Sequence, residues 1–504
     1  MPLVLSADNQ YSPWTGLVYI FNLIVGTGAL TLPHSFLKAG WGLGLALIII
    51  LAFVSFVTAT FVLEAISCAN FIARYKRMKQ LARVSRRIAR VNHESETEDD
   101  GAEEFNEDAP LVSSTDDAVD RFPSQPQQLF SLNEKLEMGD MANMFFGRFG
   151  QFLFFFCFAI YLYGDLAIYT AVVSKSLSDV VCTYEPSSNA TCGDDLPPDT
   201  ECWEGFPMTR LSMYRILVAT FLGFIGPFAF FNVQKTKYLQ LFTSFMRWLA
   251  FSVMISLAVR QLILKGPEGH PNIANIRGLP ALLGASVYSF MCHHSLPGLV
   301  APISGTTHIK RLLAMDYILI ASFYLLLSLT GVFAFPHPDE LYTLVFNPRC
   351  SSSNLEDSLL MRIIGYFLAL FPVFTLSTSF PIIAITLRNN LQNATLGSNS
   401  TSYPWVVQRL LFPFLSVIPP VLVALISENL EILVRITGSF AGAGIQYIIP
   451  ALLVFFARRE VKKLSSGDVQ NVFASPFQGT FWVVIVLLWA AACILLVFVN
   501  LFAS

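Results

Sequence analysis

The segment FNLIVGTGALTLPHSF, from Phe21 to Phe36, decides the fold because it is an apolar run that contains helix-breaking residues. Gly26 and Gly28 lie in its middle and Pro33 follows, and both residue types disfavour a helix interior. Within a bilayer an opened backbone has no water to bond, so the gap must line a cavity inside the protein. We therefore expect a broken membrane helix here, with an ordinary kink packed against a neighbouring helix as the alternative.

The composition of the chain excludes an ordinary soluble protein. Its 504 residues are 54% hydrophobic and 13% charged, whereas a soluble domain is roughly 25% charged. The charges are also concentrated, since 12 of the 35 Asp and Glu residues fall within 94–120 and 8 of the 32 Lys and Arg residues within 74–90. The remainder is a series of apolar runs near the roughly 20 residues that cross a bilayer as a helix. This pattern predicts an all-α polytopic membrane protein and gives no indication of nucleic-acid binding.

A window of roughly 19 residues predicts about eleven spans. We expect them at residues 14–38, 42–69, 149–175, 210–231, 238–261, 279–302, 311–335, 359–387, 406–426, 431–457 and 479–502. They divide the chain into three parts: a cytosolic N-terminus with helices 1 and 2 (1–69), a charged and largely disordered cytosolic insertion (70–148), and helices 3 to 11 (149–504).

Basic residues predict that the N-terminus is cytosolic. With that orientation most basic clusters fall on the cytosolic side, which is the usual bias in membrane proteins. These clusters are Arg74 to Arg90, Lys235 and Lys237, Lys310 and Arg311, Arg388, and Arg458 to Lys463. The membrane itself is left open between the plasma membrane and the lysosome or endosome.

The loop after the third span is then expected outside the cytosol. It carries the sequon Asn189-Ala190-Thr191, a predicted glycosylation site. Four cysteines also map to outer loops, where an oxidising compartment favours two disulfides. Three pairings are possible, and free thiols are the competing interpretation. These cysteines are Cys182, Cys192, Cys202 and Cys350.

A second span is interrupted in the same way as the first. The sixth span contains GASVYSFMCHHSLPGLV, from Gly284 to Val300, in which polar residues precede Pro297 and Gly298. The first and sixth spans occupy corresponding places in two halves of five helices. Two interrupted spans at such places predict an inverted-repeat transporter with a binding site near the membrane midplane.

Three segments carry a resemblance to a known family. FNLIVGTGALTLPHSF, YSFMCHHSLP (288–297) and ITGSFAGAGIQYIIPALLVFF (436–456) resemble the amino acid/auxin permease family of amino acid transporters. The resemblance implies a LeuT-like fold with a 5+5 inverted repeat and an eleventh transmembrane helix. It also implies secondary transport of amino acids driven by Na⁺ or H⁺, with no other cofactor. We expect a monomer whose partners are an amino acid and the lipid bilayer, and a cytosolic partner of the insertion is left open.

The same resemblance implies the first-span and eighth-span residues of the site, and the remaining residues are expected there because they lie at the interruption of the sixth span or at membrane depth. The α-carboxylate of a substrate is expected at the main chain of the first-span glycines, where the following half-helix directs its positive end at an anion. The expected substrate-binding residues are Gly26, Thr27, Gly28, Ala29, Tyr288, Cys292 and His293. The expected ion-coupling residues are Asn22, Ser377, Thr378, Ser379 and Asp165. For the hydroxyl groups of the eighth span, bonding to the local backbone is the alternative.

Ionisable residues at membrane depth are functional candidates by default. Asp165 and Arg247 lie near the middle of the third and fifth spans, and we expect them to form a buried ion pair because either charge alone would be costly. In the alternative, Asp165 carries a proton. Glu64 and Arg435 lie nearer the ends of their spans and are expected to snorkel.

Adjacent histidines occur at the interruption of the sixth span. His293 and His294 cannot both face one point on a helix, so at most one is expected to line the site. No second cluster with metal-ligand spacing accompanies them, and we therefore expect no zinc site there.

The leading functional hypothesis is a transporter of a neutral or small amino acid. A nutrient sensor that binds an amino acid and signals through the insertion is the first alternative. A membrane-embedded enzyme is disfavoured because the chain contains no GxSxG or HExxH motif.

The expected orientation is tested by glycosylation. Asn189→Gln should abolish any glycan-dependent shift on a gel, because the outer loop is exposed to the glycosylation machinery. Asn393→Gln and Asn399→Gln should leave the shift unchanged, since both sequons are expected in the cytosol. Loss of a glycan in either of these variants would show that the chain has the opposite orientation in the membrane.

Overall fold

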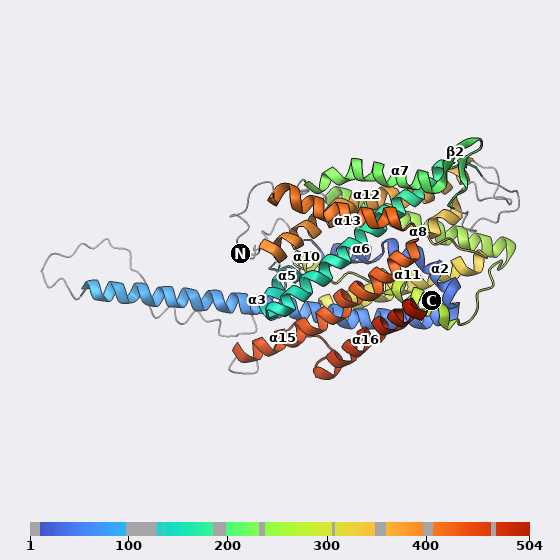
Figure 1. Cartoon of the computed structure of the whole chain (residues 1–504). Coiled ribbons are helices and arrows are strands. Elements are labelled where there is room, and N and C mark those ends of the chain that lie inside the picture. Colours follow the sequence, from blue (N-terminus) through green and yellow to red (C-terminus); the bar gives the residue numbers. More distant parts are fainter. Residues whose placement is uncertain are drawn as a thin grey trace.

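The computed structural model describes residues 11–96, 129–134, 136–184, 198–230, 237–304, 308–347, 359–396, 407–464 and 470–503. Within these residues the chain forms a bundle of long helices with one small hairpin at its edge (Figure 1). Nine of the described helices are long and apolar enough to cross a membrane, or ten if the bent pair α1 (Pro13–Ile24) and α2 (Thr27–Ala39) is one span. The polytopic helical class predicted from the composition is thereby confirmed.

The other long helices coincide with predicted spans. They are α3 (Trp41–Glu96), α6 (Arg148–Val181), α7 (Arg210–Ile225), α8 (Lys237–Lys265), α11 (Ile309–Ala334), α12 (Leu359–Leu396), α13 (Phe412–Ile426), α14 (Leu430–Ile436) continued by α15 (Ile449–Leu464), and α16 (Thr480–Ala503). Large apolar side chains remain exposed on the outside of the bundle, among them Phe149, Phe224 and Ile426. Such a surface is stable when lipid covers it.

Shorter elements connect or interrupt these helices. They are α5 (Met138–Phe145), the 3₁₀ helices η3 (Gly226–Phe230), η4 (Ile276–Gly278) and η6 (Tyr342–Phe346), and the π-helical turns η9 (Val407–Leu411), η10 (Thr437–Gly442) and η11 (Gly444–Ile448). The turns η10 and η11 join α14 to α15 within one long span.

The predicted sixth span is divided into two short helices. Its residues form α9 (Leu279–Ser289), with 11 residues, and α10 (Leu296–Val300), with 5 residues. Neither is long enough to span a bilayer alone. The predicted first span is divided as well, because α1 and α2 meet at an angle of 52°. Both interruptions read from the sequence are therefore present as breaks.

The helix α3 is much longer than a membrane is thick. Its 56 residues extend about 84 Å at 1.5 Å per residue, and its second half projects from the end of the bundle (Figure 1). The first part of the predicted insertion is thus an extension of this helix. The acidic part of the insertion lies mostly outside the described residues.

The expectation that Glu64 snorkels to water is wrong. Glu64 is buried in α3 and forms two hydrogen bonds with the guanidinium of Arg458 in α15, at 2.8 and 2.7 Å. The amide of Ser475 also donates to the same carboxylate at 2.9 Å. The two ionic groups lie far apart in the sequence, and they meet because α3 and α15 pack side by side.

A small antiparallel hairpin covers the other end of the bundle. It consists of β1 (Glu201–Trp203) and β2 (Phe206–Thr209) and lies opposite the projecting half of α3 (Figure 1). A disulfide between Cys182 and Cys202 ties this hairpin to the end of α6. Cys192, Cys350 and Asn189 lie outside the described residues. One of the pairings open to the four outer cysteines is therefore present.

Small residues allow α9 to approach α14 and η10 closely. A Cβ atom added at Gly284 would lie 2.6 Å from Cα of Arg435 and 3.0 Å from Oγ of Ser439. The facing residue Gly438 also contacts the backbone of Gly284. Close helix packing, which membrane helices achieve with small residues, thus accounts for Gly438.

Gly284→Ala is expected to destabilise the fold, because the added methyl group meets backbone that can move only if two helices separate. The expected loss is about 1–3 kcal/mol of unfolding free energy, seen as a lower melting temperature of the purified protein in detergent. Gly223→Ala is the matched control, since its Cβ would meet no atom within 4 Å. Equal melting temperatures for the two variants would contradict the packing described.

Candidate functional site

The break in the first span lies between Ile24, the last residue of α1, and Thr27, the first residue of α2. Val25 and Gly26 connect the two helices in non-helical conformations, with φ of −78° and −125°. The end of a helix leaves carbonyl groups without amide partners, and the start of the next leaves free amide groups. Both sets lie in the interior of the bundle and therefore need partners from other helices.

Side chains from two helices bind the carbonyl end of α1. Nη1 of Arg247 in α8 donates to the carbonyl of Asn22, and it also lies 3.4 Å from the carbonyl oxygen of Val25. The hydroxyl of Tyr324 in α11 donates to the carbonyl of Ile24 at 3.0 Å. A cation at this position is favoured by the negative end of the helix dipole.

The break in the second interrupted span is held in a similar way. The hydroxyl of Tyr324 lies 2.8 Å from the carbonyl oxygen of Ser289, the last residue of α9. One buried hydroxyl thus serves the ends of both α1 and α9. Since it has one hydrogen, it donates to one of the two carbonyls at a time.

A hydrogen-bond chain joins the two breaks to α6. Oγ1 of Thr27 lies 3.2 Å from the hydroxyl of Tyr288, and that hydroxyl donates to Oδ1 of Asp165. All three side chains are buried. The chain therefore links the first residue of α2, the end of α9 and the middle of α6.

The expected ion pair between Asp165 and Arg247 is wrong. Among the described residues, Asp165 has its hydrogen bond from Tyr288, and Arg247 donates to the carbonyl end of α1. Both residues sit near the middle of their spans, as the sequence indicated. The depth of a residue in a membrane does not determine which way its side chain faces, and these two face different partners.

A small cavity lies at the first break. It has a volume of about 10 Å³, room for roughly one water molecule. Its walls come from the two residues between α1 and α2 and from α2, α8 and α12. The lining residues are Val25, Gly26, Thr27, Leu30, Arg247, Phe251, Phe371, Pro372, Thr375 and Leu376. The cavity therefore brings together the start of α2, a guanidinium group and the middle of α12.

The two glycines of the break serve different purposes. A Cβ added at Gly26 would meet no atom within 4 Å, so this position is open. A Cβ added at Gly28 would lie 2.6 Å from Oγ and 2.7 Å from Cα of Ser289, so Gly28 allows α2 to pack against α9. Of this pair, only Gly26 has open space beside it.

The other expected substrate-binding residues lie around the breaks, outside the lining of this cavity. Ala29 is fully buried in α2. Sγ of Cys292 lies 3.3 Å from the hydroxyl of Tyr317. Nε2 of His293 lies 2.9 Å from Oγ1 of Thr58 and 3.2 Å from the carbonyl oxygen of Ser55. Cys292 and His293 thus fasten the second break to α11 and α3.

The expected ion-coupling residues are divided between α1 and α12. The amide side chain of Asn22 is buried, and neither its oxygen nor its nitrogen has a partner among the described residues. The hydroxyls of Thr378 and Ser379 donate to the carbonyl of Thr375 at 2.9 and 3.0 Å. Ser377 is half-buried. Bonding to the local backbone, the alternative weighed from the sequence, accounts for two of the three hydroxyls.

Three residues of this region were not expected at the site. Tyr324 and Thr375 were not identified from the sequence, and Arg247 was assigned a different partner. Thr375 belongs to the same polar segment as Ser377 and lines the cavity. Tyr324 follows an unremarkable apolar pattern in α11, and the sequence holds no signal that it reaches two helix ends.

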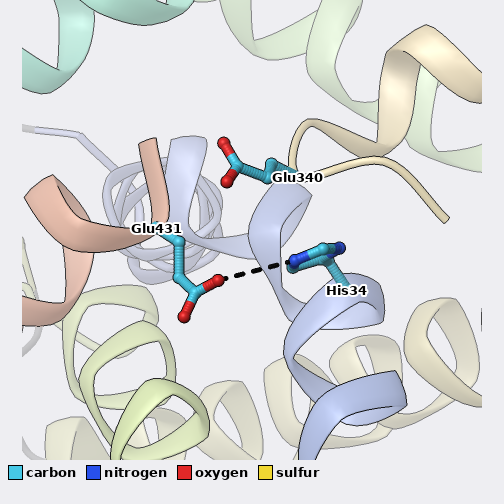
Figure 2. A group of neighbouring side chains, drawn as sticks. All are labelled: His34, Glu340 and Glu431. Atoms are coloured by element: carbon cyan, nitrogen blue, oxygen red, sulfur yellow. Dashed lines mark ion pairs between the residues drawn. The ribbon is translucent and has the colours of Figure 1, made fainter. Parts of the chain in front are cut away.

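A second group of ionisable residues lies further along α2. Figure 2 shows His34 of α2 beside Glu431, in the first turn of α14, and Glu340, which follows α11. Nε2 of His34 lies 3.6 Å from Oε2 of Glu431, while Nδ1 lies 2.9 Å from the carbonyl oxygen of Pro338. Lys38 of α2 also pairs with Glu431.

This group connects three helices. Lys175 of α6 lies 3.4 Å from Oε2 of Glu340, and the amide of Leu430 donates to the same oxygen at 3.2 Å. One ligand atom from each of His34, Glu340 and Glu431 lies within 4.8 Å of the others, a spacing compatible with a metal ion. Since Lys38 and Lys175 neutralise the two carboxylates, we interpret the group as an ion-pair network that holds α2 against α6 and α14.

Comparison with known proteins identifies related chains. A family model described as transmembrane amino acid transporter protein matches residues 9–84 and 130–498. Transmembrane protein 104 homolog of Drosophila melanogaster is 46% identical over 99% of this chain and 98% of its own. Transmembrane protein 104 is 47% identical in both Mus musculus, over 96% of this chain and 95% of its own, and Homo sapiens, over 98% and 97%. The unmatched residues 85–129 fall within the predicted insertion.

Double-mutant cycles test the partners of Asp165. Tyr288→Phe and Asp165→Asn should each cost about 1–3 kcal/mol of unfolding free energy, because each leaves a buried group without its partner. The double variant should cost less than the sum, with a coupling of about 1 kcal/mol or more. Denaturation in detergent, followed by circular dichroism, measures these values.

The control cycle combines Asp165→Asn with Arg247→Gln. Its coupling should be smaller than that of the first cycle, because the two side chains face different partners. A stronger coupling between Asp165 and Arg247 than between Asp165 and Tyr288 would contradict these contacts and support the ion pair expected from the sequence.

Proposed function

We propose that this chain, which belongs to the transmembrane amino acid transporter family, is a secondary active transporter that moves an amino acid across a membrane. Transport is coupled to Na⁺ or H⁺, and the substrate is a neutral or small amino acid. The protein works by alternating access in a LeuT-like fold of five plus five helices, with α16 as the eleventh span outside the repeat. It has a cytosolic N-terminus and a glycan at Asn189.

The observation that carries this proposal is the cavity at the first break. The amide of Ala29 donates to the carbonyl of Gly26 at 3.2 Å, whereas the amides of Thr27 and Gly28, the first two residues of α2, have no acceptor within their own helix and carry the positive end of its dipole. Gly26 leaves them open to the cavity. A carboxylate is the ligand that such amides bind, and every α-amino acid has one. We therefore place the substrate carboxylate at the main chain from Gly26 to Ala29, with Tyr288, Cys292 and His293 nearby.

The size of the cavity supports alternating access. A volume of about 10 Å³ is far below the roughly 300–1,000 Å³ of typical ligand pockets. A substrate enters only when helices move apart, so the conformation described is a closed one. The ion-pair network of His34, Lys38 and Glu431 holds α2 to α14. It must open for access from that end of the bundle.

Coupling requires a group that responds to an ion. For sodium the candidate ligands are Asn22, Ser377, Thr378 and Ser379, at the broken end of α1 and in the middle of α12. For protons the candidate is Asp165, whose hydrogen bond to Tyr288 connects it to Thr27 at the first residue of α2. A change in the charge of Asp165 would alter the contact between α6 and the break.

A nutrient sensor remains the second candidate function, and α3 favours it. This helix runs from the bundle core into the insertion without interruption. A rigid helix of this length would carry a movement of the core to a cytosolic partner of residues 70–148.

Uptake of radiolabelled amino acids into proteoliposomes tests the proposal. The wild-type protein should accumulate substrate, and Gly26→Val should abolish binding and uptake because its side chain enters the cavity. The Cβ of the new side chain meets no atom within 4 Å, and the melting temperature of Gly26→Val checks that the variant folds. Gly223→Val, at an open position in α7, is the matched control and should transport normally.

Three outcomes separate the alternatives. Normal binding by a folded Gly26→Val protein would overturn the placement of the site. Saturable binding by the wild-type protein without accumulation would favour the sensor. Chemical conversion of the substrate would favour an enzyme.

A further inference from the structure

A positively charged side chain already occupies the cation-binding end of α1. Arg247 extends from the middle of α8 to the carbonyl groups of Asn22 and Val25, and it lines the cavity at the break. Backbone carbonyls at the end of a broken membrane helix are the groups that bind a coupling ion in transporters of this kind. Here those oxygens accept hydrogen bonds from a guanidinium.

The surroundings of Arg247 indicate that its positive charge interacts with the carbonyl end of α1. Among the described residues no carboxylate forms an ion pair with it, and Asp165 is bonded to Tyr288 instead. A charged group at membrane depth without a carboxylate partner is rare and is usually functional. The carbonyl end of α1, with its negative dipole, stabilises the charge.

The remaining wall of the cavity is formed by α12. Thr375 and Pro372 of α12 line the cavity together with Arg247. Oγ1 of Thr375 lies 3.1 Å from the carbonyl oxygen of Phe371 and 3.4 Å from that of Pro372. Val25 at the end of α1 and Thr375 in α12 therefore line the same small cavity as Arg247. A sodium ion there would compete with the guanidinium for the same carbonyls and would be repelled by its charge.

We propose that Arg247 is a built-in substitute for the coupling sodium ion, so that substrate binding and transport do not depend on sodium. The guanidinium holds the end of α1 in the shape that the binding site requires, and it does so permanently. This inference rests on the proposed transport function and narrows it, because protons remain as the coupling ion. Asn22 and the hydroxyls of α12 are then remnants of the site rather than sodium ligands in the wild-type protein.

Replacement of Arg247 should create a dependence on sodium. In Arg247→Gln the charge is absent, while the carbonyls of Asn22 and Val25 remain. The wild-type protein should take up substrate equally, within about twofold, in sodium and in choline at fixed pH. Arg247→Gln should transport at least about tenfold faster in sodium than in choline, a difference that corresponds to about 1.4 kcal/mol of sodium binding. Arg247→Lys keeps the charge, so its substrate uptake should be independent of sodium, whatever its uptake rate.

Thermal shift in detergent gives a readout that does not require transport. Sodium chloride, compared with choline chloride at equal ionic strength, should raise the melting temperature of Arg247→Gln and leave that of the wild-type protein unchanged. Arg260→Gln, in the same helix but outside the cavity lining, is the matched control and should show no sodium response. A purely structural role of Arg247 would destabilise the variant without creating a sodium-dependent shift.

The outcomes distinguish this inference from the proposed function. Sodium-dependent uptake by the wild-type protein would overturn the inference and leave the transport function intact. The inference would also be overturned if Arg247→Gln lost uptake equally in sodium and in choline and sodium did not raise its melting temperature. Arg247 would then be a structural or carboxylate-binding residue. A sodium shift gained by Arg247→Gln in a protein that transports no amino acid would support the inference while the transport proposal fails.

Discussion

The polar backbone groups at the two helix breaks must find partners inside the protein, and the centre of the bundle is built around this requirement. In a bilayer no water replaces a missing partner, so each open carbonyl or amide would cost several kcal/mol. Arg247 and Tyr324 bind the end of α1, and Tyr324 also reaches the end of α9. The amides that begin α2 face a cavity instead. The carbonyl side of the break has partners and the amide side faces a cavity, and this difference makes the break a candidate binding site.

The same contacts connect the site to the rest of the molecule. Tyr324 brings the ends of α1 and α9 to one hydroxyl, so the two breaks share a hydrogen-bond donor. Tyr288 continues the connection to Asp165 in α6. Further along α2, ion pairs from Lys38 and His34 reach α14. A movement of α2 therefore involves both the centre of the bundle and its end, which is the coupling that alternating access needs.

The sequence predicted the helical class, both breaks and disulfide bonding among the outer cysteines, with the pairing left open, because these depend on hydrophobic length, Gly and Pro positions, and compartment. It did not predict side-chain partners. Asp165 and Arg247 have suitable depth and opposite charge, yet their directions around the helix axes give them different partners. Glu64 was expected to reach water, but the packing of α3 on α15 places Arg458 beside it. Tyr324 follows an ordinary apolar pattern, and only the tertiary arrangement brings it to two helix ends.

The central claim is that the amides at the start of α2 bind the carboxylate of an amino acid. An electron cryomicroscopy map of the protein, purified with a saturating concentration of the amino acid that it takes up, tests this claim most directly. The account predicts ligand density at the break, with the carboxylate against the amides of Gly26 and Thr27 and a cavity enlarged around it. Ligand density elsewhere in the bundle, or a continuous helix through residues 24–27, would contradict it.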